Sequence, residues 1–505
     1  MKLRNIKQSF LLLVVLVAAS ACSEDFLNVD PEGTALEEAY YSNEFEAYPG
    51  LVSVYDGIGK YSVGFENMVT ILNAGSDDTY AGGGGATDGT GIQSFSNYTI
   101  SSVTIPTSYW NNFYQGIFRA NVLLVKLPEV PMDETVKARF TAESKALRAF
   151  YYFELVRLFK NIPLITVPLT PNEIASVTQV SPELIYAQIE KDLTESMPDL
   201  PMTITNPADE AGRLTKGAVQ ALLGKVYLYE GKNTLAATQF AQVNGTPGTT
   251  SQYGYKLLDN YADLWVVANK FNTESILEVS NTNRGNTGWG NWGSGSDEGN
   301  SVNVMIGPRS YSRPSGSTAP DYATGFAFNP ITQNLYDVIK TDPRFKSTVA
   351  DLKALKAAGL ADYIPGYQDT GFFIKKFMPL TADITTGGGD AVLNYRQNMY
   401  VIRLADTYLM EAEALGGTGV RAQALLDAVR ARVGLTPVAV SIDAIIAERR
   451  IELACEGHRW YDLVRTGRAA SVLANRGFVA GKNEIWPIPL KELENTQIVQ
   501  NPNYN

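Results

Sequence analysis

Apolar side chains recur at helical spacing along the chain. The clearest stretch covers residues 134–159, where apolar positions follow one another at intervals of four, four and three: Leu147, Tyr151, Leu155 and Leu158. This spacing places them on one face of an α-helix. Because Asn161 and Pro163 follow directly, the pattern predicts a long helix that ends near Phe159.

A second pair of segments carries an internal-repeat signature. Helical periodicity predicts a helix over 213–230, ended by Gly231, and a shorter helix over 234–243. Five residues fall at the tetratricopeptide spacing L-G-x2-Y followed by A-x3-F: Leu223, Gly224, Tyr227, Ala236 and Phe240. In such repeats, small residues let two antiparallel helices approach closely.

A looser unit of the same kind occurs in the last third of the chain, at Leu409, Ala422 and Leu426. Repeats of this type bury their apolar faces against neighbouring repeats. We therefore expect further helix pairs around residues 111–159 and 441–465.

Glycine-rich polar segments separate these helices. Residues 74–91 read AGSDDTYAGGGGATDGTG, and residues 281–316 combine Gly, Ser and Asn with aromatic side chains. This composition is typical of loops. The first segment is not a phosphate-binding loop, because no G-K-[ST] follows its glycines.

The N-terminus predicts export and lipidation. Lys2, Arg4 and Lys7 precede an apolar core over 10–19, which is too short to span a bilayer. Small residues then lead into Cys22, so residues 1–21 resemble a bacterial lipoprotein signal peptide, whose cleavage leaves an acylated cysteine. The acidic residues that follow resemble the surface-export signal of Bacteroidetes lipoproteins. The alternative is ordinary secretion with cleavage near residue 21.

Net charge and cysteine content limit the partners and the covalent cross-links that the chain can have. The chain has 42 basic and 53 acidic residues, a formal charge of −11. Cleavage after residue 21 removes three basic residues and gives −14, so nucleic acid is excluded as a partner. Once Cys22 is lipidated, Cys455 is the only thiol, and no intrachain disulfide can form.

Few residues suggest catalysis. His458, the only histidine, lies three positions after Cys455, and we interpret the two as neighbours on one helix face rather than as a nucleophilic pair. Glu448, Glu452 and Glu456 recur every four residues, which is typical of a charged helix face. One histidine and one thiol cannot supply a transition-metal site. Calcium held by loop carboxylates and carbonyls stays open, although no EF-hand pattern is present.

Several segments together resemble the SusD/RagB family of Bacteroidetes outer-membrane lipoproteins, from the lipobox to the last residues. They are 22–31 (CSEDFLNVDP), 110–121 (WNNFYQGIFRAN), 143–163 (ESKALRAFYYFELVRLFKNIP), 214–230, 403–414 (RLADTYLMEAEA), 448–468 (ERRIELACEGHRWYDLVRTGR) and 486–489 with Asn501, Pro502 and Tyr504. Singly these matches are modest. Their number and order carry the resemblance.

The resemblance implies a mainly α fold. About four tetratricopeptide-like helix pairs would form a scaffold, mainly over 34–72, 108–245 and 395–470, with long loops and small β elements on one side. The loop-rich ligand side would cover mainly 73–107 and 246–394, within one SusD-like domain over 22–505. Members of the family act as lids on a SusC-like TonB-dependent transporter at the cell surface, anchored in the outer membrane by lipid.

A glycan-binding role requires aromatic rings that stack on sugars, with polar groups beside them. The loop candidates are Trp289 and Trp292, with Asn291 between them. Asp77, Asp78 and Tyr80 would face these two rings. Arg309 and Tyr311 would complete an arc around the ligand. The alternative is that each tryptophan only pins its loop to the helical body. Trp110, Trp460 and Trp486 lie in the resembling segments, and there we expect core packing.

Three functions remain at this point. The favoured one is a non-catalytic glycan-binding lipoprotein that serves as a lid for an importer. A RagB-like protein that captures peptides is the second, and would have a cleft lined by backbone partners and charges instead of rings. An envelope glycoside hydrolase is the third, and would need two carboxylates across a cleft, such as Asp77 or Asp78 with a distant partner.

Overall fold

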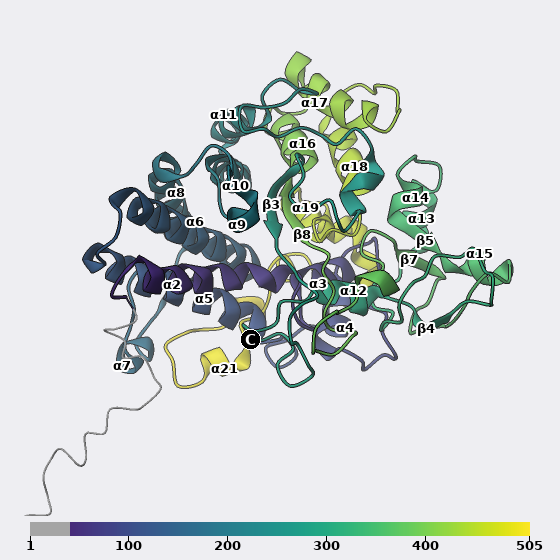
Figure 1. The fold of residues 1–505 in the computed structure, drawn as a ribbon, viewed down its shortest axis with the longest axis horizontal. Helices are drawn as coiled ribbons and strands as arrows, with labels where there is room; N and C mark the ends of the chain where they lie inside the picture. The colour runs from purple at the N-terminus through teal and green to yellow at the C-terminus, as the bar shows by residue number, and fades with distance from the viewer. Residues whose placement is uncertain (1–40, 505) are drawn as a thin grey trace, which may run out of the picture.

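The computed structural model describes residues 41–504, so the predicted signal at 1–21 and Cys22 lie outside the described residues. Within this part of the chain the fold is mainly helical (Figure 1). The longer helices are α2 (Glu44–Tyr55), α5 (Ser108–Lys126), α6 (Glu134–Phe159), α8 (Pro182–Ser196), α10 (Lys216–Tyr229), α11 (Asn233–Asn244), α16 (Leu404–Ala414), α17 (Gly419–Ala431) and α18 (Ile442–Glu452).

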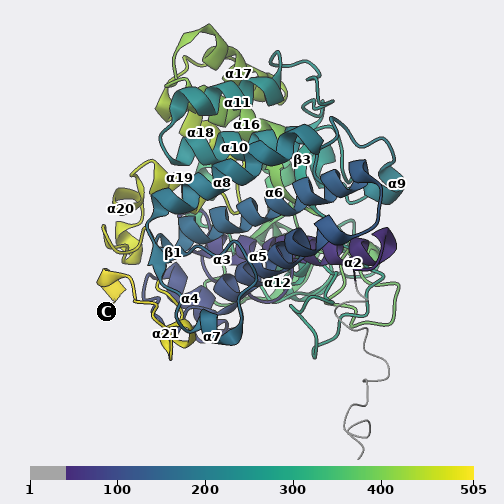
Figure 2. The same ribbon diagram turned by 90° about the vertical axis from the view of Figure 1, so that its left-hand side faces the viewer.

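These helices pack as four pairs, α2 with α5, α6 with α8, α10 with α11, and α16 with α17. The pairs follow one another across the molecule, and Figure 2 shows α5, α6, α8, α10 and α11 stacked side by side. The prediction of about four tetratricopeptide-like pairs is therefore confirmed. None of the helices within residues 41–504 has both the length and the apolar composition needed to cross a bilayer.

Helix α6 has the bounds that the sequence predicted. The Asp133 carboxylate caps its first turn by accepting hydrogen bonds from the backbone N–H groups of Thr135 and Val136, at 2.9 and 3.1 Å. Lys160, with a φ of +66°, ends it. From Phe140 onward nearly every residue is buried, because α6 packs against α5 and α8 at once.

The repeat signature explains how α10 and α11 pack. A Cβ atom built on Gly224 would lie 2.8 Å from Cε1 of the Phe240 ring, closer than real Cβ atoms come. Only glycine therefore lets this ring sit against α10. In the looser unit, Ala422 and Leu426 are buried as the pattern requires.

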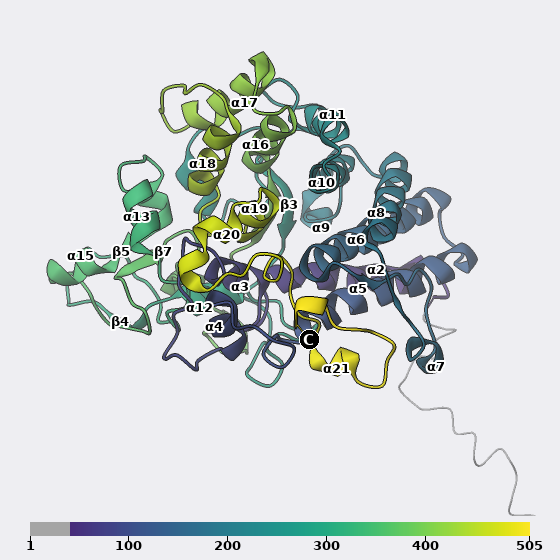
Figure 3. The ribbon, with the colours of Figure 1, turned by 180° about the vertical axis from the view of Figure 1, so that it is seen from behind.

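The rest of the described chain consists of loops with short elements, and Figure 3 shows the part that spans residues 309–374 on the side away from α6 and α8. Its helices include η2 (Asp56–Tyr61), α3 (Met68–Ala74), α4 (Thr90–Ser96), α12 (Ser301–Ile306), α13 (Gln333–Ile339), α14 (Phe345–Thr348) and α15 (Leu352–Ala357). Helix α19 (Arg459–Arg465), α20 (Ala469–Val472) and α21 (Leu490–Leu493) follow the last long helix.

Four two-stranded antiparallel sheets occur within residues 41–504, and one of them pairs segments more than 100 positions apart. They are β1 (Ile162–Pro163) with β2 (Gln179–Val180), β3 (Ser275–Val279) with β8 (Met399–Arg403), β4 (Arg309–Ser312) with β6 (Asp362–Ile364), and β5 (Val349–Asp351) with β7 (Phe372–Ile374). The pairing of β3 with β8 joins the loop-rich part to the last helix pairs.

The C-terminal acidic segment differs from the prediction. Glu448, Glu452 and Glu456 do form ion pairs, but all three are buried and their partners come from other elements. The pairs are Arg344 with Glu448 and Glu452, Arg403 with Glu452 and Glu456, and Lys376 with Glu456. The segment is thus a buried ionic network and not a solvated helix face.

Helix α18 also ends earlier than the periodicity suggested. Cys455 and Gly457 have φ angles of +65° and +83°, which break the helix after Glu452. Cys455 is buried as predicted, but it and His458 do not share a helix face. Trp110, Trp460 and Trp486 are buried in the core, which confirms their predicted packing role.

Candidate functional site

The loop between β3 and α12, residues 280–300, carries the two tryptophans of the predicted site. The Asp297 carboxylate holds this loop together. It accepts hydrogen bonds from the backbone N–H groups of Gly293 and Gly299, at 2.8 and 3.1 Å, and from the Thr287 hydroxyl at 3.0 Å. Burial raises the pKa of Asp297. The loop is therefore organised around one buried carboxyl group.

Trp289 and Trp292 form an exposed aromatic surface on this loop. The Trp289 side chain is 58% exposed, while Trp292 is half-buried. Their ring centroids lie 5.6 Å apart with the planes at 89°. Trp292 Nε1 donates a hydrogen bond to the Ser301 hydroxyl at 2.7 Å, which fixes the inner ring. The inner ring thus pins the loop, and the outer ring faces solvent.

Two phenylalanines extend this surface. Phe326 lies 6.4 Å from Trp289 and 6.3 Å from Trp292, and Phe65 packs edge-on to Trp292 at 5.6 Å, all between ring centroids. Both phenylalanines are half-buried. We call Trp289, Trp292, Phe65 and Phe326 the aromatic platform. Edge-to-face contacts of this kind hold rings in fixed orientations.

Asn291 lies between the tryptophans as predicted, but it serves the turn. Its Oδ1 accepts a hydrogen bond from the Gly288 N–H at 2.7 Å, and its Nδ2 donates to the Ser296 hydroxyl at 3.1 Å. The Trp289 N–H donates in turn to the Asp390 carboxylate at 3.2 Å. These bonds orient the backbone that presents Trp289.

The glycine run lies beside the platform through Phe328, which packs edge-on to Phe65 with centroids 5.4 Å apart. A Cβ atom on Gly83 would meet the Phe328 ring at 2.8 Å, and one on Gly84 would lie 3.1 Å from Arg309 Nη1. Arg309 is half-buried and has no ion pair among residues 41–504. The structure thus brings Arg309 to the glycine run that adjoins the platform.

Asp77, Asp78 and Tyr80 have other partners. The Asp77 carboxylate accepts hydrogen bonds from Arg459 at 2.8 and 3.1 Å, and Arg450 pairs with both aspartates at 2.9 and 2.8 Å. Although burial acts to raise it, the two arginines hold the pKa of Asp77 below its usual value, whereas burial raises that of Asp78. The Arg476 guanidinium lies over the Tyr80 ring at 5.0 Å.

The contacts of Asp77, Asp78 and Tyr80 with these arginines join the start of the glycine run to the C-terminal helices. They do not direct carboxylates at the tryptophans.

Tyr311 also has other partners. Its hydroxyl donates to the Pro320 carbonyl at 2.8 Å, and its ring lies 5.5 Å from that of Tyr322. Of the predicted arc, the structure thus groups Trp289, Asn291 and Trp292, with Arg309 nearby.

Sequence reasoning missed Phe65 and Phe326 of the platform, and Asp297 as the anchor of its loop. Phe326 stands among small residues in an otherwise loop-like segment, which is a weak signal for an exposed ring. Phe65 gives no comparable signal. Its role depends on a contact with Trp292, more than 200 positions away.

The only thiol and the only imidazole among residues 41–504 belong to Cys455 and His458. Burial raises the pKa of the Cys455 thiol and lowers the pKa of His458 to about 4, so near neutral pH the thiol is protonated and the imidazole is uncharged. Within residues 41–504 no three His, Cys, Asp or Glu side chains are grouped so that they could hold a metal ion.

Comparison with known proteins shows what the chain is similar to. The profile of the SusD family matches residues 226–484, and one described as "Starch-binding associating with outer membrane" matches residues 85–228. Across its whole length the chain is 26% identical to SusD-like protein P38 of Formosa agariphila, which is also covered completely. It is 25% identical to the starch-binding protein SusD of Bacteroides thetaiotaomicron, over 74% of this chain and 73% of the relative.

Solved structures agree with these matches. A laminarin-binding SusD-like protein superposes with a TM-score of 0.90 at 65% identity, covering 92% of this chain and all of the other. Surface glycan-binding protein A of Bacteroides thetaiotaomicron, solved with laminarihexaose, gives a TM-score of 0.80 at 25% identity over 91% and 99%. The helix-pair scaffold and these similarities, which extend over nearly all of the chain, establish that it belongs to the SusD family.

Proposed function

We propose that this chain is a cell-surface lipoprotein that binds a laminarin-type glucan on the aromatic platform and presents it to a SusC-like TonB-dependent transporter. The observation that carries the proposal is Trp289, which stays 58% exposed although Trp292 and Phe326 contact its ring and Asp390 holds its backbone N–H. Burying a large ring is normally favourable. A fixed and exposed ring is therefore what a binding surface for sugar requires.

The ligand class follows from the same site and from the comparisons. Stacking on Trp289 suits the apolar face of an uncharged pyranose, and the unpaired Arg309 guanidinium can donate hydrogen bonds to hydroxyl groups. A structure that matches this chain at 65% identity is that of a laminarin-binding protein. Laminarin is an uncharged glucan, which fits a platform made of rings.

We propose binding without hydrolysis. A glycosidase needs two carboxyl groups on opposite sides of the bond that it cleaves. Asp77 and Asp78, the carboxylates that the sequence placed beside the rings, are instead paired with Arg450 and Arg459. Incubating the purified protein with laminarin should release no reducing sugar, and release of sugar would contradict this part of the proposal.

The location proposed is the outer face of the outer membrane, with lipid on Cys22, the helix pairs facing the transporter and the loop-rich side facing the ligand. The matched description of residues 85–228 names association with the outer membrane. Growth with labelled palmitate should label the protein, and Cys22→Ala should abolish the label. Labelling of the Cys22→Ala protein would contradict the proposed anchor.

Binding is tested with Trp289→Ala and isothermal titration of laminarihexaose. The expected loss of affinity is at least tenfold, about 1.4 kcal/mol. Trp289→Phe should recover part of it, because a smaller ring still stacks. Phe45→Ala is the control, since Phe45 is 82% exposed near the start of α2 and does not belong to the platform. Unchanged affinity in Trp289→Ala, or retention of a peptide library in place of glucans, would contradict the proposal.

A further inference from the structure

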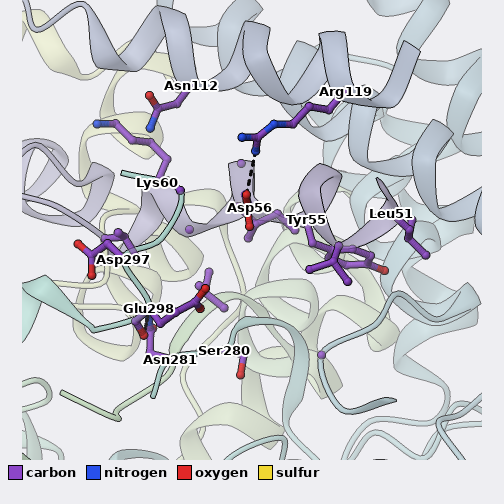
Figure 4. Close-up of a pocket in the computed structure, with 18 of the residues that line it drawn as sticks. Leu51, Tyr55, Asp56, Lys60, Asn112, Arg119, Ser280, Asn281, Asp297 and Glu298 are labelled. Atoms are coloured by element: carbon purple, nitrogen blue, oxygen red, sulfur yellow. Dashed lines mark hydrogen bonds and ion pairs between the residues drawn. The ribbon is translucent and has the colours of Figure 1, made fainter. Parts of the chain in front are cut away.

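A cavity of about 560 Å³ lies beneath the loop that carries the platform tryptophans. Its walls come from α2, η2 and α5, from residues 209–213, and from residues 278–281 and 293–298 (Figure 4). The 280–300 loop thus presents rings on one surface and closes a cavity with another. No residue of the aromatic platform lines this cavity.

The cavity wall offers hydrogen-bonding groups that the protein does not use. Within residues 41–504, the side chains of Asn112, Gln115, Ser280 and Glu298 make no hydrogen bond. Asp56 uses one carboxylate oxygen to pair with Arg119 at 2.9 Å. Amides, hydroxyls and carboxylates of this kind are the groups that bind sugar hydroxyls.

Apolar side chains lie beside these polar groups. Leu51, Ile58 and Val279 are buried in the wall, and Tyr48 and Val52 are more than 40% exposed at its edge. A wall that alternates apolar patches with hydrogen-bonding groups suits a ligand with CH faces and hydroxyl edges. A pyranose ring has both.

The charges of the wall disfavour an anionic ligand, because acidic side chains outnumber basic ones. Three basic side chains line the cavity, Lys60, Arg119 and Arg213, against five acidic ones: Asp56, Asp209, Glu278, Asp297 and Glu298. Arg119 is paired with Asp56, and Arg213 with Glu143. Burial lowers the pKa of Lys60 to about 8, and its Nζ donates a hydrogen bond to the Ser108 hydroxyl at 2.8 Å. Burial and the neighbouring Asp56 raise the pKa of Glu298.

Gly295 keeps the cavity open at the charged end. A Cβ atom built on it would lie 3.4 Å from Asp56 Oδ2 and 3.6 Å from Arg119 Nη2, so a longer side chain would fill the space above this ion pair. The backbone of the 280–300 loop can therefore approach the Asp56–Arg119 pair without covering it.

We propose that this cavity is a second carbohydrate site, which takes a short uncharged stretch of glycan independently of the aromatic platform. The inference rests on the proposed function for its ligand class. It makes each chain bivalent, with the two sites built from different residues of one loop. For polymeric glycans, two linked sites raise the apparent affinity above that of either site alone.

The test counts laminaritriose bound to the intact mature protein by native mass spectrometry. Wild-type protein should bind two molecules, Trp289→Ala one, and Asn112→Leu with Gln115→Leu one. The three substitutions combined should bind none. Asn111→Leu is the matched control, because Asn111 is exposed on the same helix and does not line the cavity. It should still bind two.

The outcomes separate the two proposals. If wild-type protein binds one molecule and only Trp289→Ala loses it, the second site is refuted and the platform stands. If Trp289→Ala keeps both molecules while the cavity variant loses one, the platform is refuted. Glu298→Ala, which removes an exposed side chain without intramolecular bonds, should also lower the count to one. Retention of two by both cavity variants would overturn the inference.

Discussion

Arg403 and Glu452 form an ion pair with no solvent exposure, in which Nη1 of the arginine lies 2.6 Å from Oε1 of the glutamate. Arg403 is the last residue of β8, and Glu452 is the last residue of α18. The same guanidinium pairs with Glu274 and Glu456, each at 2.9 Å. One arginine therefore joins the β3–β8 sheet to the C-terminal helices.

Replacing Arg403 with methionine should destabilise the protein strongly, because it leaves buried carboxylates without a counter-charge. The expected loss in the free energy of unfolding is about 3–5 kcal/mol. Urea denaturation measures it. Lys340→Met, which breaks an exposed ion pair with Asp337, is the control and should cause no measurable change. A loss below about 1 kcal/mol for Arg403→Met would show that the network does not hold these elements together.

Gly224→Ala tests the helix-pair packing. The added Cβ would lie 2.8 Å from the Phe240 ring, so the two helices must separate or the ring must move. Overpacking of this kind costs about 1–3 kcal/mol. Gly85→Ala is the matched control, because a Cβ there meets no atom within 4 Å. Equal thermal unfolding temperatures for the two variants would contradict the close approach of α10 and α11.

His458 should make the protein less stable in mild acid. Burial lowers its pKa from 6.5 to about 4 in the folded state, so the unfolded chain binds a proton first as the pH falls. This contribution to stability is complete above pH 6.5 and is lost between pH 6.5 and 4, amounting to about 2 kcal/mol at pH 5. Urea denaturation at pH 7 and pH 5 measures the difference. His458→Gln should show a smaller loss, and an equal loss in both proteins would refute this role.

Asp297→Ala should weaken glycan binding although Asp297 does not belong to the platform. Without the carboxylate, the N–H groups of Gly293 and Gly299 lose their acceptor, and binding must then order the loop. We expect the affinity for laminarihexaose to fall about tenfold in isothermal titration, roughly 1.4 kcal/mol. Asp321→Ala, at an exposed ion pair with Arg313, serves as the control. An affinity equal to that of the wild-type protein would show that the loop needs no anchor.

Local signals predicted the helices well. The bounds of α6 follow from the apolar periodicity of its residues and from Asn161 and Pro163 beyond its end, all of which are close in sequence. The pairing of α10 with α11 follows from the Gly224 and Phe240 spacing. In both cases the determining contacts lie within a few turns of helix.

Long-range partners could not be predicted. Asp77 and Asp78 are paired with Arg450 and Arg459, more than 370 positions away, and nothing in the glycine-rich segment indicates this. The four-residue spacing of Glu448, Glu452 and Glu456 indicates a charged helix face but does not indicate that this face is buried. The burial of these glutamates depends on ion pairs with Arg344 and Arg403, which belong to other elements.

The central claim is that glycan binds at Trp289. A crystal structure of the mature protein with laminarihexaose tests it most directly. The account predicts a pyranose ring stacked on the exposed face of Trp289. A hexasaccharide bound only to the helix pairs, with the Trp289 ring left in solvent, would contradict it.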